Sequence, residues 1–444
     1  MLVPFVAVFS QPSFHNFVVV LEGWILAGMR AMTSTALAAH GVFPKHFATY
    51  YRFFSEGAWC ADALGMALLE LVLPFAPRGA LVIVVDDTLA PKTGKNIWGA
   101  NLHHDPLGWL PNAVAFGHNW VVLAIVIRVP LVERAVAVPV FWPLYRSKKT
   151  RTGKTLRGRR EAKTTGASTA KDHRTRPELA VELLHVLRKA LGDGRIIHLV
   201  GDSAYGGKSI TRHLPEDTAC ISRLPMNAAL YELAPARRRC QNGRPRKKGA
   251  RLPSPKAMLK DKKGWRKASL RLYGKNVPVR YKTRIALWYN SAGNLPLRIL
   301  VVRDPKGRRR DDAFYSTHPD MDVQAILETY AQRWSLEVAF RDTKQQLGFE
   351  RSQARTRKAV ERTGPFAFVA YTITVAWFCR IGHRHYPTLP IMPWYRHKRG
   401  PSFADMQTLM QREILNQGFS HTPANIHLFE KHKRANIHAH RQAV

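Results

Sequence analysis

One segment near residue 340 carries polar side chains at a spacing suited to phosphate chemistry. Four of them fall within roughly 60° of one face if residues 322–347 form a single helix. They are Tyr330, Arg333, Glu337 and Lys344, and Arg341 lies in the same sector. Because cations surround it, Glu337 is expected to be ionised and able to bind a metal ion, while the cations hold phosphates. The alternative is a solvated helix face with ion pairs four residues apart.

Aspartates stand at the ends of two apolar runs that are typical of buried strands. Residues 80–85 run into Asp86 and Asp87, and residues 195–201 run into Asp202. Ends of adjacent strands lie close together, and a glutamate on a packed helix can reach them. Three carboxylates placed in this way can hold two divalent ions roughly 4 Å apart, which stabilise the attacking and leaving oxygens of a phosphodiester. The pattern therefore predicts metal-dependent phosphodiester cleavage.

The elements that have to position these residues follow from the hydrophobic pattern. Strands are predicted at 80–88, 113–129, 135–146 and 195–201, and helices at 176–191 and 322–347. Gly192 and Gly348 end the two helices. This order of three strands, a helix, a strand and a later long helix is that of a ribonuclease-H-like catalytic core. We therefore predict an α/β fold class with a mixed sheet.

The regions around this core differ from it in pattern. Apolar residues recur at helical spacing from about 12 to 77, and residues 235–317 alternate as strands do. We predict a helical N-terminal region at 1–78, the first part of the core at 79–234, a mostly β insertion at 235–318, and the second part of the core with a C-terminal helical region at 319–444. Around Gly41 the N-terminal region shows a weak helix-turn-helix pattern, a candidate for binding DNA ends, although a plain helical hairpin explains it equally well.

The charge balance points to a polyanionic partner. Lys and Arg number 69 against 31 Asp and Glu, which gives a formal net charge of +38. A field of this size attracts nucleic acid and releases its counterions. The basic residues gather in two segments, 145–176 and 236–267, which are predicted to be loops that contact phosphates without reading sequence. Because the cations do not follow one face of an amphipathic helix, the pattern favours nucleic acid over a membrane surface.

The cysteines and the N-terminus bear on the compartment. No two cysteines form a CxxC pair, so neither a zinc site nor a disulfide framework is indicated. The first basic residue is Arg30, so the apolar start lacks the basic region of a signal peptide. We expect a cytoplasmic protein without a membrane partner. The four cysteines are Cys60, Cys220, Cys240 and Cys379.

Residues after the first predicted strand offer weaker candidates. Lys92 and Lys95 are interpreted as loop residues, which either contact phosphates or are solvated. His103 and His104 are also interpreted as loop residues, because adjacent side chains diverge in an extended chain and Mg²⁺ prefers oxygen ligands.

The motifs are similar to those of a known family. The spacing Y-x2-R-x3-E-x6-K of the four residues in 322–347 resembles the YREK signature of a large group of bacterial insertion-sequence transposases. VVDDT at 84–88 resembles the first catalytic aspartate motif of that group, and GDSAYGG at 201–207 resembles the second. The resemblance covers roughly residues 81–378.

The resemblance implies a DDE transposase. Asp87, Asp202 and Glu337 match the three catalytic metal ligands, which hold two Mg²⁺ ions, with Mn²⁺ as a substitute. Side chains alternate along a strand, so either Asp86 or Asp87 can face the metals. We expect Asp87 to be the ligand and Asp86 to be a neighbouring structural carboxylate.

The resemblance also implies the partners. Tyr330, Arg333, Arg341 and Lys344 are expected to bind phosphates of DNA. The DNA partners would be the terminal inverted repeats of a mobile element and the target, in a complex expected to contain a dimer. Metal-activated water would cleave the element end, and the freed 3′-OH would join it to the target. The rival interpretations are a ribonuclease-H-like nuclease that does not join DNA, and an inactive DNA-binding protein derived from a transposase.

Overall fold

The computed structural model describes most of residues 1–416. Much of the first basic segment, the start of the second, and Lys95 lie outside the described residues. The residues not described are 42–44, 95, 106–112, 149–151, 156–157, 162–171, 237–242, 273–274, 390–392, 394–397 and 417–444.

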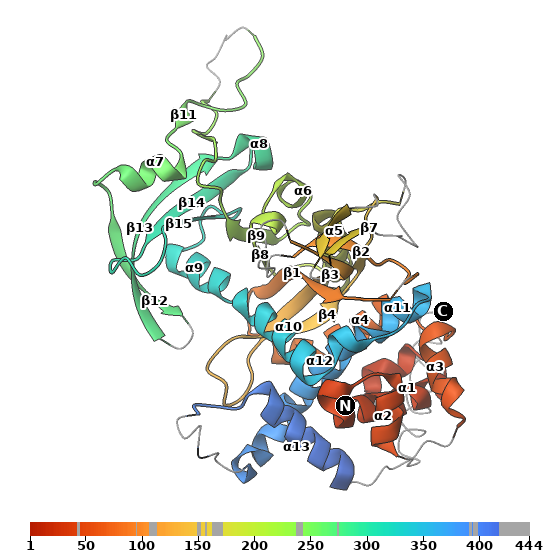
Figure 1. Cartoon of the computed structure of the whole chain (residues 1–444). Helices are drawn as coiled ribbons and strands as arrows, with labels where there is room; N and C mark the ends of the chain where they lie inside the picture. Colours follow the sequence, from red (N-terminus) through yellow and green to blue (C-terminus); the bar gives the residue numbers. More distant parts are fainter. Residues whose placement is uncertain are drawn as a thin grey trace, which may run out of the picture.

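Helices form the N-terminal region and share a core with a helix near the C-terminus (Figure 1). Phe17 and Trp24 both pack against Phe366 at the start of α12. Helix α12 is apolar on all sides and is buried along nearly its whole length, as expected for a helix at the centre of a core. The helices are α1 (Gln11–Ala27), α2 (Thr33–His40), α3 (Phe47–Ser55), α4 (Ala61–Val72) and α12 (Phe366–Arg380), with 3₁₀ turns at Val3–Ala7, Gly28–Arg30 and Leu73–Phe75.

Gly23 allows α1 and α2 to approach each other closely. A Cβ at this position would lie 2.1 Å from the carbonyl oxygen of Ala36. We expect Gly23→Ala to lower the free energy of unfolding by about 1–3 kcal/mol, because the helices would have to separate. Chemical denaturation measures this change. Gly207→Ala is the control, because a Cβ there meets no atom within 4 Å; equal stability of the two variants would contradict the prediction.

A mixed sheet forms the centre of the molecule. Strand β1 pairs in parallel with β8, and β8 pairs in parallel with β9. On its other edge β1 pairs antiparallel with β3, which in turn pairs with β2, β4 and β5. This is a ribonuclease-H-like arrangement, and the predicted α/β fold class is confirmed. The strands are β1 (Leu81–Pro91), β2 (Asn101–His104), β3 (Val114–Ile127), β4 (Val136–Phe141), β5 (Leu144–Tyr145), β8 (Ile197–Gly201) and β9 (Thr218–Arg223), with a separate hairpin of β6 (Thr152–Thr155) and β7 (Gly158–Glu161).

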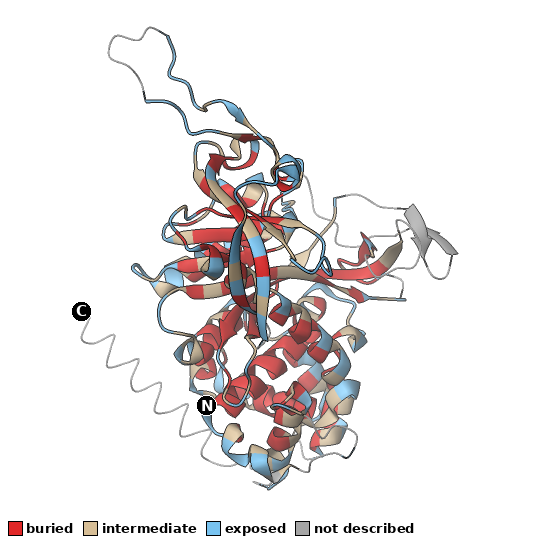
Figure 2. Cartoon of the chain, turned by 90° about the vertical axis from the view of Figure 1, so that its left-hand side faces the viewer, coloured by how far each residue is buried: buried red, intermediate tan, exposed pale blue. Residues whose placement is uncertain are grey.

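The sheet continues into the segment predicted as an insertion. Strand β15 pairs antiparallel with β9, and β14 and β13 follow it, so the segment is hydrogen-bonded to the core (Figure 1). Of its strands, β12 and β13 carry more exposed residues than the central strands do (Figure 2). Its elements are β10 (Leu230–Tyr231), β11 (Arg251–Leu252), α7 (Pro255–Lys260), β12 (Arg266–Leu272), β13 (Lys275–Leu287), α8 (Tyr289–Ala292), β14 (Pro296–Arg303) and β15 (Asp312–Ser316).

Helices cover both faces of the central sheet. Helix α5 packs on β3 and on the short helix α6, whereas α10 and α12 pack on β4. Helix α5 ends at Gly192, as predicted. The helices are α5 (Arg176–Leu191), α6 (Lys208–Thr211), α9 (Val323–Ala331), α10 (Trp334–Gln346), α11 (Arg357–Thr363) and α13 (Phe403–Asn416), with 3₁₀ turns at Ser203–Tyr205, Phe349–Arg351 and Gly382–Thr388.

Two sequence predictions about these elements are wrong in detail. The single helix expected at 322–347 is interrupted at Gln332 and Arg333, where Arg333 N–H donates to Tyr330 O (3.0 Å) in a tighter turn. Tyr330 therefore belongs to a different helix from Glu337. The first strand does not end at its aspartates but continues to Pro91, because β3 keeps pairing with it after β8 has ended.

Within the described residues, no single helix has the length and hydropathy needed to cross a membrane. The segments 11–30 and 33–40 meet those criteria only as a pair, and they meet at an angle of 109°.

Candidate active site

Asp86 and Asp202 follow the last paired residues of two parallel strands. In the register of β1 and β8, Val85 lies opposite Gly201, so the next residue on each strand is an aspartate. Residues at matching positions of parallel strands point to the same face of the sheet. The strand pairing therefore makes the two carboxylates neighbours, although 115 residues separate them along the chain.

The Asp86 carboxylate is largely enclosed. One oxygen accepts from the Asp87 backbone N–H (2.9 Å), and the other accepts from the Arg333 guanidinium (2.9 Å). Burial raises the pKa of Asp86 to about 7; the charge of Arg333 lowers that pKa, and the charge of Asp202 raises it further. Burial therefore disfavours the ionised form of Asp86, and the charge of Arg333 offsets part of that effect.

Asp87 points to the opposite face of β1 and is held by a different set of groups. One oxygen accepts from Asn119 (2.8 Å) and from Arg176 at the start of α5 (2.7 Å), and the other accepts from the Tyr205 hydroxyl (3.0 Å). Both oxygens are thus engaged by neighbouring side chains. The contacts of Asp87 are those of a carboxylate that joins β1, β3 and α5.

Arg333 connects Asp86 to Glu337. Its guanidinium contacts Asp86 through one nitrogen (2.9 Å) and Glu337 through another (2.5 Å). Burial opposes the charge of Arg333, but the two carboxylates outweigh it and raise the arginine pKa above its ordinary value. The break between α9 and α10 places Arg333 at the helix junction, with its side chain between the carboxylates of β1 and α10.

Asp202 is oriented by the turn that follows β8. Its Oδ1 accepts from the backbone N–H of Ala204 (2.8 Å) and Tyr205 (3.4 Å). In the described part of the chain, no cationic side chain forms an ion pair with Asp202. The carboxylate is therefore fixed on one side by backbone and retains an oxygen for another ligand.

Tyr330 and Lys344 each contact a strand of the sheet. The Tyr330 ring packs against Phe314 of β15, with 4.7 Å between ring centroids. The Lys344 ammonium donates to Leu89 O of β1 (2.8 Å) and pairs with Glu350 (2.9 Å). The charges of Arg333 and Asp202 act on the Tyr330 hydroxyl, so Tyr330 lies near this site. The contacts of Lys344 are with Leu89 and Glu350 and not with Asp86, Asp202 or Glu337.

Arg341 is placed differently from the other predicted cations. Its exposed side chain pairs with the adjacent Asp342 (2.9 Å), whose own surroundings include Arg134 and Tyr371. The structure does not bring Arg341 into contact with the carboxylates of the site.

The weaker candidates have structural contacts. Lys92 donates to the carbonyl oxygens of Glu350 (2.8 Å) and Ser352 (2.7 Å), and burial lowers its pKa to about 8. His103 and His104 belong to β2 and not to a loop, which corrects the prediction. None of these contacts involves Asp86, Asp202 or Glu337.

Sequence reasoning missed the residues that hold Asp87. Asn119 lies within an apolar strand, and Arg176 lies at a helix start where the Thr175–Glu178 capping box was the readable signal. Tyr205 is part of the GDSAYGG motif, but its hydroxyl contact runs from the 3₁₀ turn after β8 to Asp87 on β1. Only the register between β1 and β3 shows that Asn119 comes within reach of Asp87.

Comparison with models of protein families shows which family the chain belongs to. Residues 4–292 match the model of the DDE superfamily endonucleases, which is more than half of the chain. The chain belongs to the DDE superfamily. The match contains Asp86, Asp87 and Asp202 and ends before Glu337. A search of curated proteins found no match.

Membership of the DDE superfamily indicates a transposase-type nuclease that acts on DNA and depends on a divalent metal. The donor chemistry of the site fits such an ion, because the crowded carboxylates supply the oxygen ligands that hard cations prefer. Within the described residues, no three acidic, histidine or cysteine side chains are already grouped as one metal site. Arg333 lies between two of the carboxylates, since it pairs with both Asp86 and Glu337.

Proposed function

We propose that the protein is a DDE transposase of the group with the YREK signature, and that Asp86, Asp202 and Glu337 are its metal ligands. The observation that supports this proposal is the adjacency of Asp86 and Asp202 at matching positions of β1 and β8, with Glu337 joined to Asp86 through Arg333. We assign this ligand role to Asp86 and not to Asp87, which was the ligand expected from the sequence. Both oxygens of Asp87 already accept hydrogen bonds on the opposite face of β1.

The proposed ligands would hold two Mg²⁺ ions, or Mn²⁺ in their place. When bound, these ions would activate water and stabilise the leaving oxygen of the DNA phosphodiester. Asp202 is kept in place by backbone N–H groups, so it needs no rearrangement to serve as a ligand. Asp87 acts as a positioning residue, because it ties β1 to Arg176 and Tyr205 and so fixes the backbone that carries Asp86.

The cations around the site would bind the DNA strand. Arg333 and Lys344 can exchange their carboxylate partners for phosphates, and Tyr330 can donate through its hydroxyl. Arg341 is half exposed and would contact phosphates farther from the cleavage point. We propose that the DNA consists of the terminal inverted repeats of a mobile element and a target, bound by a dimer in the cytoplasm.

We also propose that the chain is divided into domains between residues 78 and 79, 234 and 235, and 318 and 319, as the sequence pattern predicts.

Cleavage of the DNA that borders the coding sequence tests this proposal. Wild-type protein is incubated with end-labelled duplexes of both borders and Mg²⁺, beside Asp202→Asn and Glu337→Gln. We expect cleavage at the border of the element by the wild type and none by either variant, with DNA binding retained. Glu56→Gln is the control, because this carboxylate is exposed directly after the end of α3. Unchanged cleavage by Glu337→Gln would overturn the DDE assignment.

Strand transfer separates a transposase from a nuclease. A precleaved border duplex with a free 3′-OH is mixed with supercoiled plasmid, and joined products are counted by sequencing. The transposase proposal requires joined molecules in which the element end is covalently attached to plasmid DNA. Cleavage without any joined product would favour the nuclease that cuts but does not join.

DNA affinity is expected to fall steeply with salt. The net charge of +38 provides many cations to displace counterions from DNA. If about 6–10 phosphates are contacted, raising the salt from 50 to 200 mM should weaken binding by roughly 10³–10⁵-fold. Fluorescence anisotropy of a labelled border duplex across this range gives the slope. An affinity independent of salt would contradict binding through phosphates.

A further inference from the structure

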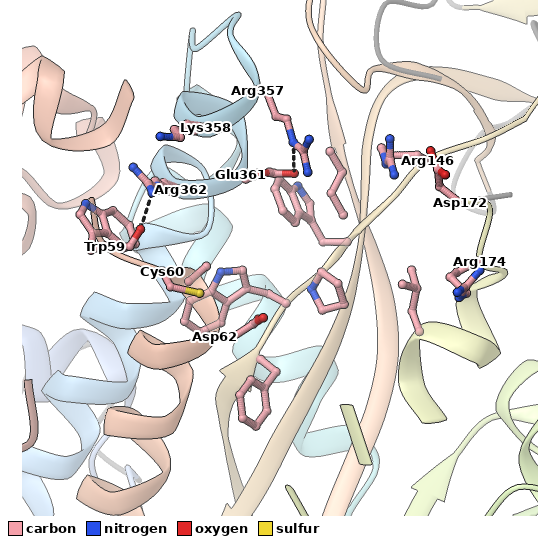
Figure 3. Close-up of a pocket in the computed structure, with 17 residues that line it drawn as sticks. Trp59, Cys60, Asp62, Arg146, Asp172, Arg174, Arg357, Lys358, Glu361 and Arg362 are labelled. Carbon is pink, nitrogen blue, oxygen red and sulfur yellow. Dashed lines mark hydrogen bonds and ion pairs between the residues drawn. The ribbon is translucent and has the colours of Figure 1, made fainter. Parts of the chain in front are cut away.

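A pocket of about 650 Å³ lies beside the active site, between the N-terminal helices and the sheet. Figure 3 shows the start of α4, the helix α11 and the segment before α5 around it. None of the proposed metal ligands lines it. The pocket is therefore separate from the carboxylate site, and its own residues have to indicate what it binds.

The pocket combines an apolar wall with a cationic rim. The wall is made by buried residues of β3, β4 and the segment after β4, of which Trp120 and Trp142 are the largest. Several cationic side chains line the same space (Figure 3). They are Arg146, Arg174, Arg357, Lys358 and Arg362, against the acidic Asp62, Asp172 and Glu361. A ligand that fits this pocket has both a flat apolar part and a negative charge.

The cations of α11 have two different roles. Arg362 is buried, stacks on Trp59 (4.3 Å) and donates to the carbonyl oxygens of Gly57 (2.9 Å) and Trp59, so it holds the wall together. Arg357 and Lys358 are exposed at the rim. Arg357 pairs with Glu361 (3.4 Å) and stacks over the ring of Trp98 (5.5 Å). Within the described residues no ion pair or hydrogen bond is found for Lys358. Lys358 can therefore bind an incoming phosphate directly, and the exposed Arg357 can do so by exchanging Glu361 for it.

The pocket is close to the catalytic strand. Trp120 lies opposite Thr88 in the pairing of β3 with β1, and Thr88 is two residues from Asp86 on the same face of the strand. The Cα atoms of Trp120 and Asp86 are therefore about 8 Å apart from strand geometry alone. The wall of the pocket therefore begins close to the strand that carries Asp86.

We propose that this pocket binds an unpaired nucleotide of the DNA strand that occupies the active site. The base lies against the apolar wall, and its phosphate is held by Arg357 and Lys358. Proteins that bind single strands combine cations along the backbone with aromatic surfaces for the bases in this way. The occupant is unpaired because the bases of a duplex are stacked on each other, and a base enters a pocket only after leaving the stack. The inference rests on the proposed function, since it takes DNA as the substrate.

Cys60 provides a probe of the pocket that requires no change in its lining. This thiol is exposed and lines the pocket, whereas burial raises the pKa of both Cys220 and Cys379 to about 12 and keeps them unreactive. Cys240, outside the described residues, is replaced with serine. The rate at which a maleimide alkylates Cys60 is then measured with metal omitted, while anisotropy of the same labelled oligonucleotide reports DNA binding.

We expect a saturating single-stranded oligonucleotide to slow alkylation of Cys60 by about tenfold, the effect of one stacked base. A blunt duplex at saturation should protect much less. Arg357→Ala combined with Lys358→Ala should remove most of the protection, whereas Arg52→Ala combined with Lys189→Ala, at exposed sites away from the pocket, should leave it intact.

Three results would overturn the inference while leaving the proposed function standing. These are full DNA binding without protection of Cys60, equal protection by blunt duplex, and unchanged protection in the Arg357→Ala, Lys358→Ala variant. Absence of any DNA binding would overturn the inference together with the proposed function.

Discussion

Asp86→Asn is expected to reduce metal-dependent DNA cleavage by about three orders of magnitude or more, whereas Asp87→Asn retains cleavage within about 10–100-fold of wild type. The two residues are adjacent in sequence but point to opposite faces of β1. Loss of a charged ligand removes several kcal/mol of stabilisation of the transition state. Loss of a positioning carboxylate only loosens the backbone that carries the ligand.

The contacts of each aspartate explain this difference. Asp86 lies beside Asp202 and is joined to Glu337 through Arg333. Asp87 instead accepts from Asn119, Arg176 and Tyr205, so its replacement leaves Arg176 without its partner. We therefore expect Asp87→Asn to lower the free energy of unfolding by about 1–3 kcal/mol, which Asp86→Asn does not.

Cleavage rates and denaturation curves of the two variants, measured side by side, check this prediction. Arg176→Gln is the matched control, because it breaks the same contact from the other partner and should resemble Asp87→Asn in both measurements. Abolished cleavage in a stably folded Asp87→Asn protein, with an active Asp86→Asn protein, would reverse the assignment of the two aspartates.

Arg333→Gln is expected to bind divalent metal more tightly than wild type when DNA is absent, yet to cleave DNA far more slowly. In the structure the guanidinium stands between Asp86 and Glu337, where its charge competes with a metal ion for both carboxylates. Removing that charge leaves two carboxylates to share a cation, which should raise Mn²⁺ affinity by about tenfold. Cleavage should fall by about 100-fold, because a phosphate loses a charged donor.

Calorimetric titration with Mn²⁺ and a single-turnover cleavage assay give the two quantities. Arg333→Lys keeps the charge and should stay close to wild type in metal affinity. Arg341→Gln serves as a second control for metal affinity, because Arg341 pairs with Asp342 and not with Asp86 or Glu337. Equal or weaker metal binding by Arg333→Gln would show that Arg333 does not compete with the ion.

The sequence was sufficient to predict the fold class but not the facing of the first aspartate. Apolar runs and helix-capping residues are local features of the sequence. The order of strands and helices could therefore be predicted from the sequence alone. Which of Asp86 and Asp87 faces the site depends on where α5 and α10 pack. That packing is set by contacts between residues more than 80 positions apart, such as Arg176 with Asp87.

The polar residues of the YREK spacing show the same limit. Their types and spacing suggested one helical face, and Glu337 with Arg333 does form a contact pair. The helix is interrupted at Gln332 and Arg333, where the sequence has no glycine or proline that would signal a break. The helical periodicity continues across these residues, so it predicted a single helix. Arg341 also satisfied the periodicity, but its neighbour Asp342 offered a closer partner than the site did.

The most direct test of the central claim replaces each proposed ligand in turn with cysteine and compares cleavage in Mg²⁺ and Mn²⁺. A thiolate is a poor ligand for Mg²⁺ and a better one for the softer Mn²⁺, so a true ligand position loses activity in Mg²⁺ and regains it in Mn²⁺. We expect this rescue for Asp86→Cys, Asp202→Cys and Glu337→Cys, and a ratio of rates equal to that of wild type for Asp87→Cys. Rescue confined to Asp87→Cys, or absent from all four variants, would contradict the metal site proposed for this protein.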